Sequence, residues 1–290
     1  TFEFSGFARF LRGVRWNDWF GVFRAPTLER KRNMEPKNTK PLGGKNYGSI
    51  AHLPGSRMGP GDHSCPEGQE RICNEKARDK HDLIVVQEKL DGSNVGVAKI
   101  DGEVLALTRA GYLAHTSPYE QHHKFGDWVA KNADRFAALL EEGERIVGEW
   151  LLQAHGTRYK LPHEPFVAFD IMRGTKRATY AEVLSRADGR FVLPHTIHVG
   201  GPLSIPDAMA KLGEFGAHGA LDPIEGAMWR VERNEIIDKS RGGERRWAVD
   251  FLAKYVRPEK ADGCYLESVT GQPTVWNVVT PNAGSNGPSA

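Results

Sequence analysis

The 290-residue sequence has few cysteines, little net charge and no long apolar run. Cys65, Cys73 and Cys264 form no Cys-x-x-Cys pair, so neither a disulfide framework nor a zinc site is predicted, and a reducing, cytoplasmic setting is expected. The 39 basic and 37 acidic side chains leave a net charge of +2, so any basic surface for nucleic acid must come from local segregation of charge. No run is long enough to cross a membrane, and no membrane partner is expected.

The two ends of the sequence differ in composition from its centre. Residues 1–23 are rich in aromatic side chains with interspersed arginines, and a basic, proline-containing linker follows. A helix that covers the main body and a segment at a membrane interface both fit residues 1–23, and we favour the helix. After Gly271 the sequence is dominated by Pro, Asn, Gly and Ser, which predicts a flexible tail. We therefore expect an N-terminal extension and linker (1–45), a main domain (46–272) and a tail (273–290).

The centre of the sequence alternates between strand and helix patterns. Hydrophobic residues make up 39% of the chain and charged residues 26%, which predicts a packed core. β-branched and alternating runs predict strands at 82–86, 95–100, 103–109, 145–150, 165–171, 225–231 and 247–256, with a polar loop at 233–246. Helical spacing predicts helices at 119–142, 179–186 and 205–215. Mostly antiparallel strands interleaved with helices indicate an α+β fold.

The stretch from Gln87 to Asn94 carries a chemical signal. Lys89 follows the apolar run 82–86 and precedes an Asp91-Gly92 turn, which would hold its amine rigidly with little water around it. Burial and neighbouring cations lower a lysine pKa, and a neutral amine is a nucleophile. The alternative for these residues alone is a hairpin turn with Lys89 as a solvated edge residue.

Several predicted strands end in a single charged residue embedded in apolar sequence. Taken singly, each is an exposed edge charge or a member of a buried ion pair. Together they would place two lysines, an arginine and three carboxylates around one cleft, which suits phosphoryl chemistry on a nucleotide with a divalent metal. These residues are Lys89, Arg109, Glu149, Asp170, Glu225 and Lys254.

The ordered series resembles the nucleotidyltransferase motifs of the ATP-dependent ligase and mRNA-capping superfamily. Lys89-Leu90-Asp91-Gly92 matches motif I, and Thr108-Arg109-Ala110-Gly111 is similar to the motif that follows it. Gly148-Glu149-Trp150 resembles motif III, and Phe169-Asp170-Ile171 resembles motif IIIa. Glu225-Gly226-Ala227-Met228 resembles motif IV, and Leu252-Ala253-Lys254 resembles motif V.

The resemblance implies an antiparallel-sheet, ATP-grasp-like adenylation domain with flanking helices over residues 46–272. Only 36 residues (290 − 254) follow Lys254, so we expect no C-terminal OB-fold. One departure is Leu252, which stands where motif V usually has its first lysine, and Arg257 or Lys260 would compensate.

The resemblance also implies roles for individual residues. Lys89 would attack the α-phosphate of ATP, and Lys254 would contact that phosphate and help to keep Lys89 deprotonated. Phe169 would stack on adenine, although a core aromatic is nearly as strong an interpretation from sequence alone. A hydrated Mg²⁺ or Mn²⁺ would be held by Asp91, Glu149 and Glu225. The nucleotide would be bound by Glu88, Asp91, Gly92, Asn94, Arg109, Glu149, Phe169, Glu225 and Lys254.

Within the superfamily, Asn94 and the segment 155–159 resemble RNA ligases. The implied reaction passes AMP from Lys89 to an RNA 5′-phosphate, which is then joined to a 3′-hydroxyl. A protein partner would supply further RNA-binding surface. Two alternatives stay open, namely a DNA ligase or capping-type guanylyltransferase that uses the same lysine, and a non-catalytic module that binds RNA ends.

Overall fold

The computed structural model describes residues 40–236 and 243–280. All described residues belong to one compact unit. Most of the expected N-terminal extension and the last ten residues of the expected tail therefore lie outside the described part.

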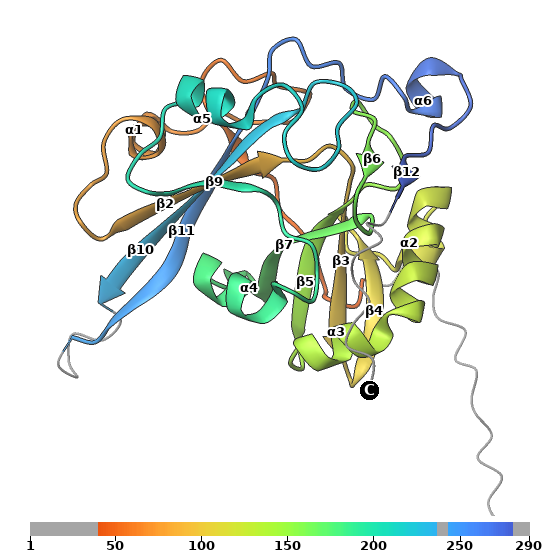
Figure 1. Ribbon diagram of the computed structural model, residues 1–290. Helices are drawn as coiled ribbons and strands as arrows, with labels where there is room; N and C mark the ends of the chain where they lie inside the picture. Colours follow the sequence, from red (N-terminus) through yellow and green to blue (C-terminus); the bar gives the residue numbers. More distant parts are fainter. Residues whose placement is uncertain (1–39, 237–242, 281–290) are drawn as a thin grey trace, which may run out of the picture. The chain divides into compact units, whose positions relative to one another are not determined.

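Two five-stranded sheets form the frame of this unit (Figure 1). The first sheet has the order β1 (Ala51–His52), β11 (Arg245–Val256), β10 (Gly226–Ile236), β2 (Asp82–Lys89), β9 (Thr196–Gly200). The second has the order β4 (Glu103–Thr108), β3 (Ser93–Ile100), β5 (Glu144–Trp150), β7 (Phe166–Arg173), β8 (Lys176–Arg177). Only β1 and β11 pair in parallel within these two sheets. The predicted mixed fold with antiparallel sheets is confirmed.

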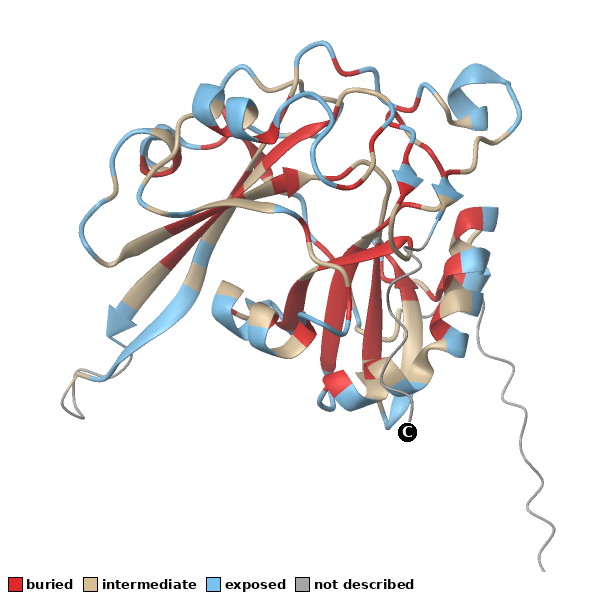
Figure 2. Cartoon of the chain, viewed as in Figure 1, coloured by how far each residue is buried: buried red, intermediate tan, exposed pale blue. Residues whose placement is uncertain are grey.

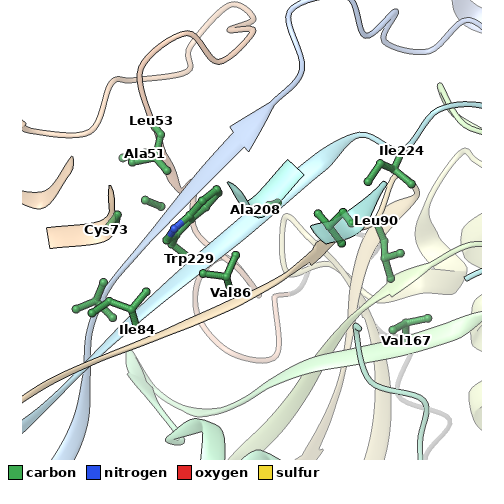
Figure 3. Close-up of a cluster of buried hydrophobic side chains, with 14 of the residues drawn as sticks. Ala51, Leu53, Cys73, Ile84, Val86, Leu90, Val167, Ala208, Ile224 and Trp229 are labelled. Atoms are coloured by element: carbon green, nitrogen blue, oxygen red, sulfur yellow. The ribbon is translucent and has the colours of Figure 1, made fainter. Parts of the chain in front are cut away.

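The first sheet buries one face under two helices. α1 (Glu67–Asn74) and α5 (Ile205–Leu212) pack there, and Ile84, Val86 and Trp229 are fully buried in the same cluster (Figure 3). Because side chains alternate along a strand, Ile84 and Val86 face this core while Lys89 belongs to the opposite face. Sequence patterns did not predict α1, since its eight residues are mostly polar.

The second sheet is covered by α2 (Glu120–Lys131), α3 (Ala133–Leu139) and α4 (Tyr180–Ala187). Figure 2 shows the resulting burial along β3, β5 and β7. The prediction of one helix at 119–142 is wrong, because Asn132 leaves the helical conformation with φ −114° and ψ 16°. Its amide side chain donates to the Trp128 carbonyl at 2.8 Å, a competing hydrogen bond that favours a break.

The other predicted helices are close to those observed. α4 starts at a capping box, in which the Thr179 hydroxyl accepts from the Glu182 N–H and the Glu182 carboxylate accepts from the Thr179 N–H. α5 ends at Leu212, before the expected residue 215, because Gly213 takes φ +68°. The remaining short helical pieces are η1 (Ala114–Thr116) and α6 (Glu267–Thr270).

Two segments are more ordered than predicted. β10 and β11 continue into the expected loop 233–246, where Glu235 pairs with Arg246 across the strands. Residues 273–280, expected in the tail, instead return to the domain, where β12 (Val278–Val279) pairs with β6 (Lys160–Leu161). The buried amide of Asn277 explains this, since it accepts from the Tyr159 N–H at 2.8 Å and donates to the Leu151 carbonyl at 2.7 Å. None of the described helices is both long and apolar enough to span a membrane.

Candidate active site

A cavity of about 800 Å³ is lined by residues from both sheets. Its volume is in the range typical of small-molecule sites. Every residue predicted to bind the nucleotide, the metal or the phosphate lines it, namely Glu88, Lys89, Asp91, Gly92, Asn94, Arg109, Glu149, Phe169, Glu225 and Lys254.

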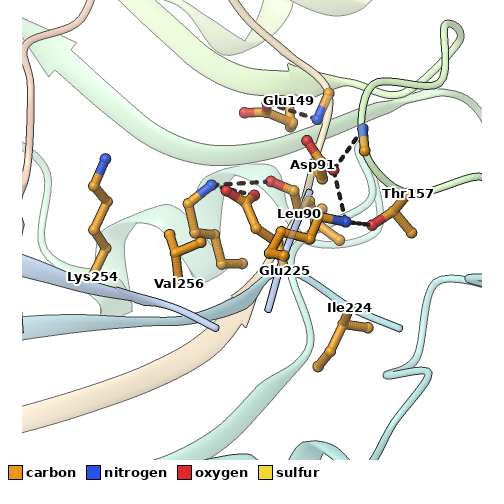
Figure 4. A network of polar contacts seen from close by, with 12 residues as sticks. Leu90, Asp91, Glu149, Thr157, Ile224, Glu225, Lys254 and Val256 are labelled. Carbon is orange, nitrogen blue, oxygen red and sulfur yellow. Dashed lines mark hydrogen bonds and ion pairs between the residues drawn. The ribbon is translucent and has the colours of Figure 1, made fainter. Parts of the chain in front are cut away.

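Lys89 and Glu225 form an ion pair within this group, and Figure 4 shows Glu225 with its polar contacts. Lys89 is the last residue of β2 and pairs with Gly226, the first residue of β10. Glu225 directly precedes that position, so the strand register brings the two side chains together. Their side chains are 19% and 11% exposed, respectively, which makes this pair only partly screened by solvent.

The ion pair alters the titration of the predicted nucleophile. Burial disfavours the Lys89 ammonium, but the carboxylates of Glu225 and Glu149 outweigh burial and raise the pKa of Lys89 above its usual value. The expectation of a lowered pKa is therefore wrong for this arrangement. Burial, together with the nearby Lys89 charge, lowers the pKa of Lys254 instead.

Glu149 comes from β5, where it lies opposite Asn94 of β3. Its carboxylate accepts from the Gly92 N–H at 3.1 Å. Burial raises the pKa of Glu149 to about 8. The nearby charges of Glu225 and Asp91 also raise this pKa, whereas the Lys89 charge lowers it. Gly92 is required here, since a Cβ at that residue would lie 2.5 Å from the Trp150 carbonyl oxygen.

The Asp91 carboxylate is held by the chain itself (Figure 4). Its Oδ2 accepts from the Gly156 N–H at 2.9 Å and lies 3.0 Å from the Nζ of Lys260. Lys260 is buried and also contacts the Thr157 hydroxyl. Of the two residues proposed to replace the missing motif V lysine, Lys260 thus approaches motif I, whereas Arg257 donates to the Ile224 carbonyl at 2.6 Å.

Sequence patterns missed two members of the site, His52 and Asp62. The Nζ of Lys254 lies 3.4 Å from Asp62, and the Nε2 of buried His52 lies 3.1 Å from the same carboxylate. His52 of β1 is the register partner of Lys254 in β11. Both missed residues lie in a loop-rich segment without periodicity, so only the parallel pairing of β1 reveals them.

Asp170 does not belong to the cleft, contrary to the expectation of three strand-end carboxylates there. It is completely buried, pairs with Arg177 and lies 3.1 Å from an Arg230 nitrogen. β7 bulges beside it, since Val147 pairs with Asp170 and Gly148 with Ala168, which leaves Phe169 without a partner. Bulges re-aim side chains near sites, and Phe169 lines the cavity against the Tyr47 ring at 5.3 Å.

Glu88 and Arg109 occupy the periphery of the site. Strand alternation directs the Glu88 side chain away from Lys89, and its carboxyl accepts from the Ala217 N–H at 2.9 Å. Burial raises the Glu88 pKa to about 7. Arg109 follows β4 and is exposed, and its carbonyl accepts from the Asn46 N–H at 3.1 Å.

The predicted three-carboxylate metal site is not present as a ready-made cluster. Across residues 40–236 and 243–280, no group of three or more His, Cys, Asp or Glu side chains is arranged to hold a metal ion. Asp91 is engaged by Lys260 and Glu225 by Lys89. Mg²⁺ commonly takes one or two carboxylates together with substrate phosphates. Glu149, which is half-buried, and Glu225, which is buried, fit that smaller role, since the pKa of each is raised and a nearby cation would favour its charged form.

The chain was compared with family models and with known proteins. A family model described as RNA ligase matches residues 82–256. An RNA ligase variant of Naegleria gruberi, solved with AMP and Mn, is 13% identical with a TM-score of 0.44, over 71% of this chain and 59% of that chain. An archaeal ATP-dependent RNA ligase is 16% identical with a TM-score of 0.37, over 72% of this chain and 48% of that chain.

One sequence relative matches a short region. Uncharacterized protein MJ0414 of Methanocaldococcus jannaschii is 59% identical over 32 residues, which are 11% of this chain and 8% of that protein. The chain thus spans less than two thirds of the length of each of these relatives.

Proposed function

Because the chain belongs to the RNA ligase family, we propose that it is an ATP-dependent RNA ligase whose nucleophile is Lys89. The observation that carries this proposal is the Lys89–Glu225 ion pair in a cavity that also contains Glu149 and Lys254. Lys89 places an amine at the end of a strand, inside a cavity large enough for a nucleotide and among charged side chains. An amine held in this way suits covalent catalysis.

In the first step the Lys89 nitrogen attacks the α-phosphorus of ATP. A P–N bond forms, the bond to pyrophosphate breaks, and Lys89 must lose its proton first because a protonated amine has no free electron pair. The ion pair with Glu225 therefore has to open before attack. Lys254, whose pKa is lowered by burial and by the Lys89 charge, supplies a cation for the α-phosphate.

The remaining residues bind and orient the nucleotide. Phe169 lines the cavity as a surface for adenine, and exposed Arg109 reaches ribose or phosphate. Asp91, in the connection between β2 and β3, and Asn94, near the start of β3, line the cavity and would make the ribose contacts. A divalent Mg²⁺ or Mn²⁺ held by Glu149 or Glu225 would neutralise phosphate charge.

Two further transfers complete the reaction. The α-phosphorus passes from Lys89 to an oxygen of an RNA 5′-phosphate, which restores the free amine. A 3′-hydroxyl then attacks the activated 5′-phosphate, and AMP leaves as the phosphodiester bond forms. We assign these steps to the domain at residues 46–272, with residues 1–45 and a partner protein as additional RNA-binding surface.

Covalent labelling tests the proposal directly. The chain is incubated with α-labelled ATP and magnesium and separated on a denaturing gel, and mass spectrometry locates the adduct. We expect one AMP on Lys89, loss of label in Lys89→Ala, and normal label in Lys160→Ala, which changes an exposed lysine of β6. Label in Lys89→Ala equal to that of the parent would refute the assignment. Label from GTP instead of ATP, or sealing of DNA alone, would favour the capping or DNA-ligase alternatives.

A further inference from the structure

A chain of hydrogen bonds runs along one wall of the same cavity, apart from the lysines and carboxylates. The Oγ of Ser117 lies 2.6 Å from His122 Nδ1, and His122 Nε2 lies 2.9 Å from the Oγ of Ser93. All three side chains line the cavity and are half-buried. Ser93 is the first residue of β3 and His122 belongs to the first turn of α2, so two regular elements fix the geometry.

We assign His122 its Nε2–H tautomer, in which the hydrogen bonds run from Ser117 through His122 to Ser93. A neutral imidazole donates from one nitrogen and accepts at the other. Ser117 Oγ accepts from the Tyr119 N–H at 3.3 Å, which leaves its own hydrogen for His122 Nδ1. The Nε2–H of His122 then donates to Ser93, whose hydroxyl retains one hydrogen and one lone pair for a further partner.

The imidazole at the centre of this chain carries no charge at neutral pH. Burial, together with the nearby His155 and His123, lowers the His122 pKa to about 4. A phosphate only accepts hydrogen bonds and is best matched by a cation. A ligand hydroxyl both donates and accepts hydrogen bonds. It therefore matches the Ser93 hydroxyl, which can still accept one hydrogen bond and donate one.

We propose that Ser117, His122 and Ser93 form a subsite for a ribose hydroxyl. The side chain of Tyr119 stands beside it, with 57% of its surface exposed and its ring perpendicular to His122 at 5.8 Å, and an exposed aromatic face can stack on a base. The subsite rests on the proposed function, which brings two riboses to this cavity. One belongs to ATP and the other to the RNA end that supplies the 3′-hydroxyl.

Removing hydroxyls from the protein and from the substrate together tests the subsite. Ser93→Ala removes the terminal hydroxyl, and His122→Phe keeps a ring but removes both nitrogens. Ser185→Ala, an exposed serine of α4 outside the cavity, is the matched control. One arm measures self-adenylylation with ATP, 2′-deoxy-ATP and 3′-deoxy-ATP. The second arm supplies pre-adenylylated RNA without ATP, and measures sealing to strands that end in a ribonucleotide or a 2′-deoxynucleotide.

We expect the parent and Ser185→Ala to favour the hydroxyl-bearing substrate by about 3- to 10-fold in one arm, the range of a single net hydrogen bond. In Ser93→Ala and His122→Phe this ratio should fall towards one, because the substitution lowers only the rate with the hydroxyl-bearing substrate. The arm in which the ratio falls identifies the ribose.

Two results would overturn the inference, and they differ in whether the proposed function also fails. Unchanged ratios in both arms, for both variants of an active enzyme, would refute the hydroxyl subsite alone. A parent chain that neither acquires AMP nor seals RNA would refute the proposed function and the subsite with it. The deoxy substrates also serve as a folding control, because a folded Ser93→Ala variant should use them at the parental rate.

Discussion

Neutralising Glu225 should make Lys89 a stronger nucleophile in the free protein. The Lys89 pKa is raised because the carboxylates of Glu225 and Glu149 outweigh burial. In Glu225→Gln the partner charge is lost while the burial remains, so the pKa should fall. In the parent, the raised pKa keeps the Lys89 amine charged up to a higher pH. When the Glu225 charge is removed, the neutral amine should appear at a lower pH.

The size of this shift follows from the geometry. Two unit charges about 4 Å apart interact by about 4 kcal/mol at an effective dielectric constant of about 20, which corresponds to roughly three pH units. The side chains of Lys89 and Glu225 are 19% and 11% exposed, so solvent reduces the effect. We therefore expect the Lys89 pKa to fall in Glu225→Gln. Below the pKa, the neutral fraction then rises at fixed pH by about tenfold for each unit of the fall.

Competitive acylation measures this quantity without nucleotide or catalysis. Parent and Glu225→Gln chains receive a brief pulse of acetic anhydride at pH 8, and mass spectrometry compares acetylation of Lys89 with that of exposed Lys160 in the same sample. Glu103→Gln, an exposed carboxylate at the start of β4, is the control and should leave the ratio unchanged. Equal Lys89 reactivity in the parent and Glu225→Gln would refute the electrostatic reasoning.

Two further predictions concern buried ion pairs. Lys260→Met removes the buried partner of Asp91 and should lower the free energy of unfolding in urea by about 3 kcal/mol. Asp91→Asn in the same chain should recover most of the loss, and parental stability of Lys260→Met would contradict the pairing. Asp170→Asn removes the buried carboxylate that Arg177 and Arg230 share and leaves Arg230 only Glu232, at 3.8 Å, so it should also cost about 3 kcal/mol. Exposed Asp188→Asn should cost little, and equal losses in both variants would contradict the prediction.

The fold and most of the site could be predicted because their signals are local. The strand β2 follows from an apolar run and stands where expected, whereas at Asp91-Gly92 the chain passes from one sheet to the other with a bend at Gly92 in place of a tight turn. Apart from Phe169, which lies within β7, the predicted nucleotide-binding residues lie near strand ends, and the sheet pairings gather those ends at one cavity. Order along the chain was therefore enough to identify these lining residues, but not His52 and Asp62.

Properties that depend on which charged side chains pair in the folded chain could not be predicted from sequence. A lone carboxylate in an apolar run has the same sequence signature whether it faces a cavity, as Glu225 does, or a buried arginine, as Asp170 does. The sign of the Lys89 pKa shift was missed for the same reason, because the Glu225 partner is 136 residues away in sequence. The break of the helix at Asn132 depends on one side-chain hydrogen bond that periodicity does not register.

The pairing of charges in the site also bears on how a nucleotide would enter it. Lys89, Lys254 and Lys260 each have a carboxylate partner within the chain, namely Glu225, Asp62 and Asp91. These pairs offset the cost of placing charges where water is scarce. A polyphosphate that takes Lys89 and Lys254 as partners must separate them from Glu225 and Asp62. The released carboxylates would then face a polyanion, which is unfavourable unless a divalent cation lies between them. The same exchange would free the Lys89 amine from the charge that keeps it protonated, so nucleotide binding and activation of the nucleophile become one event.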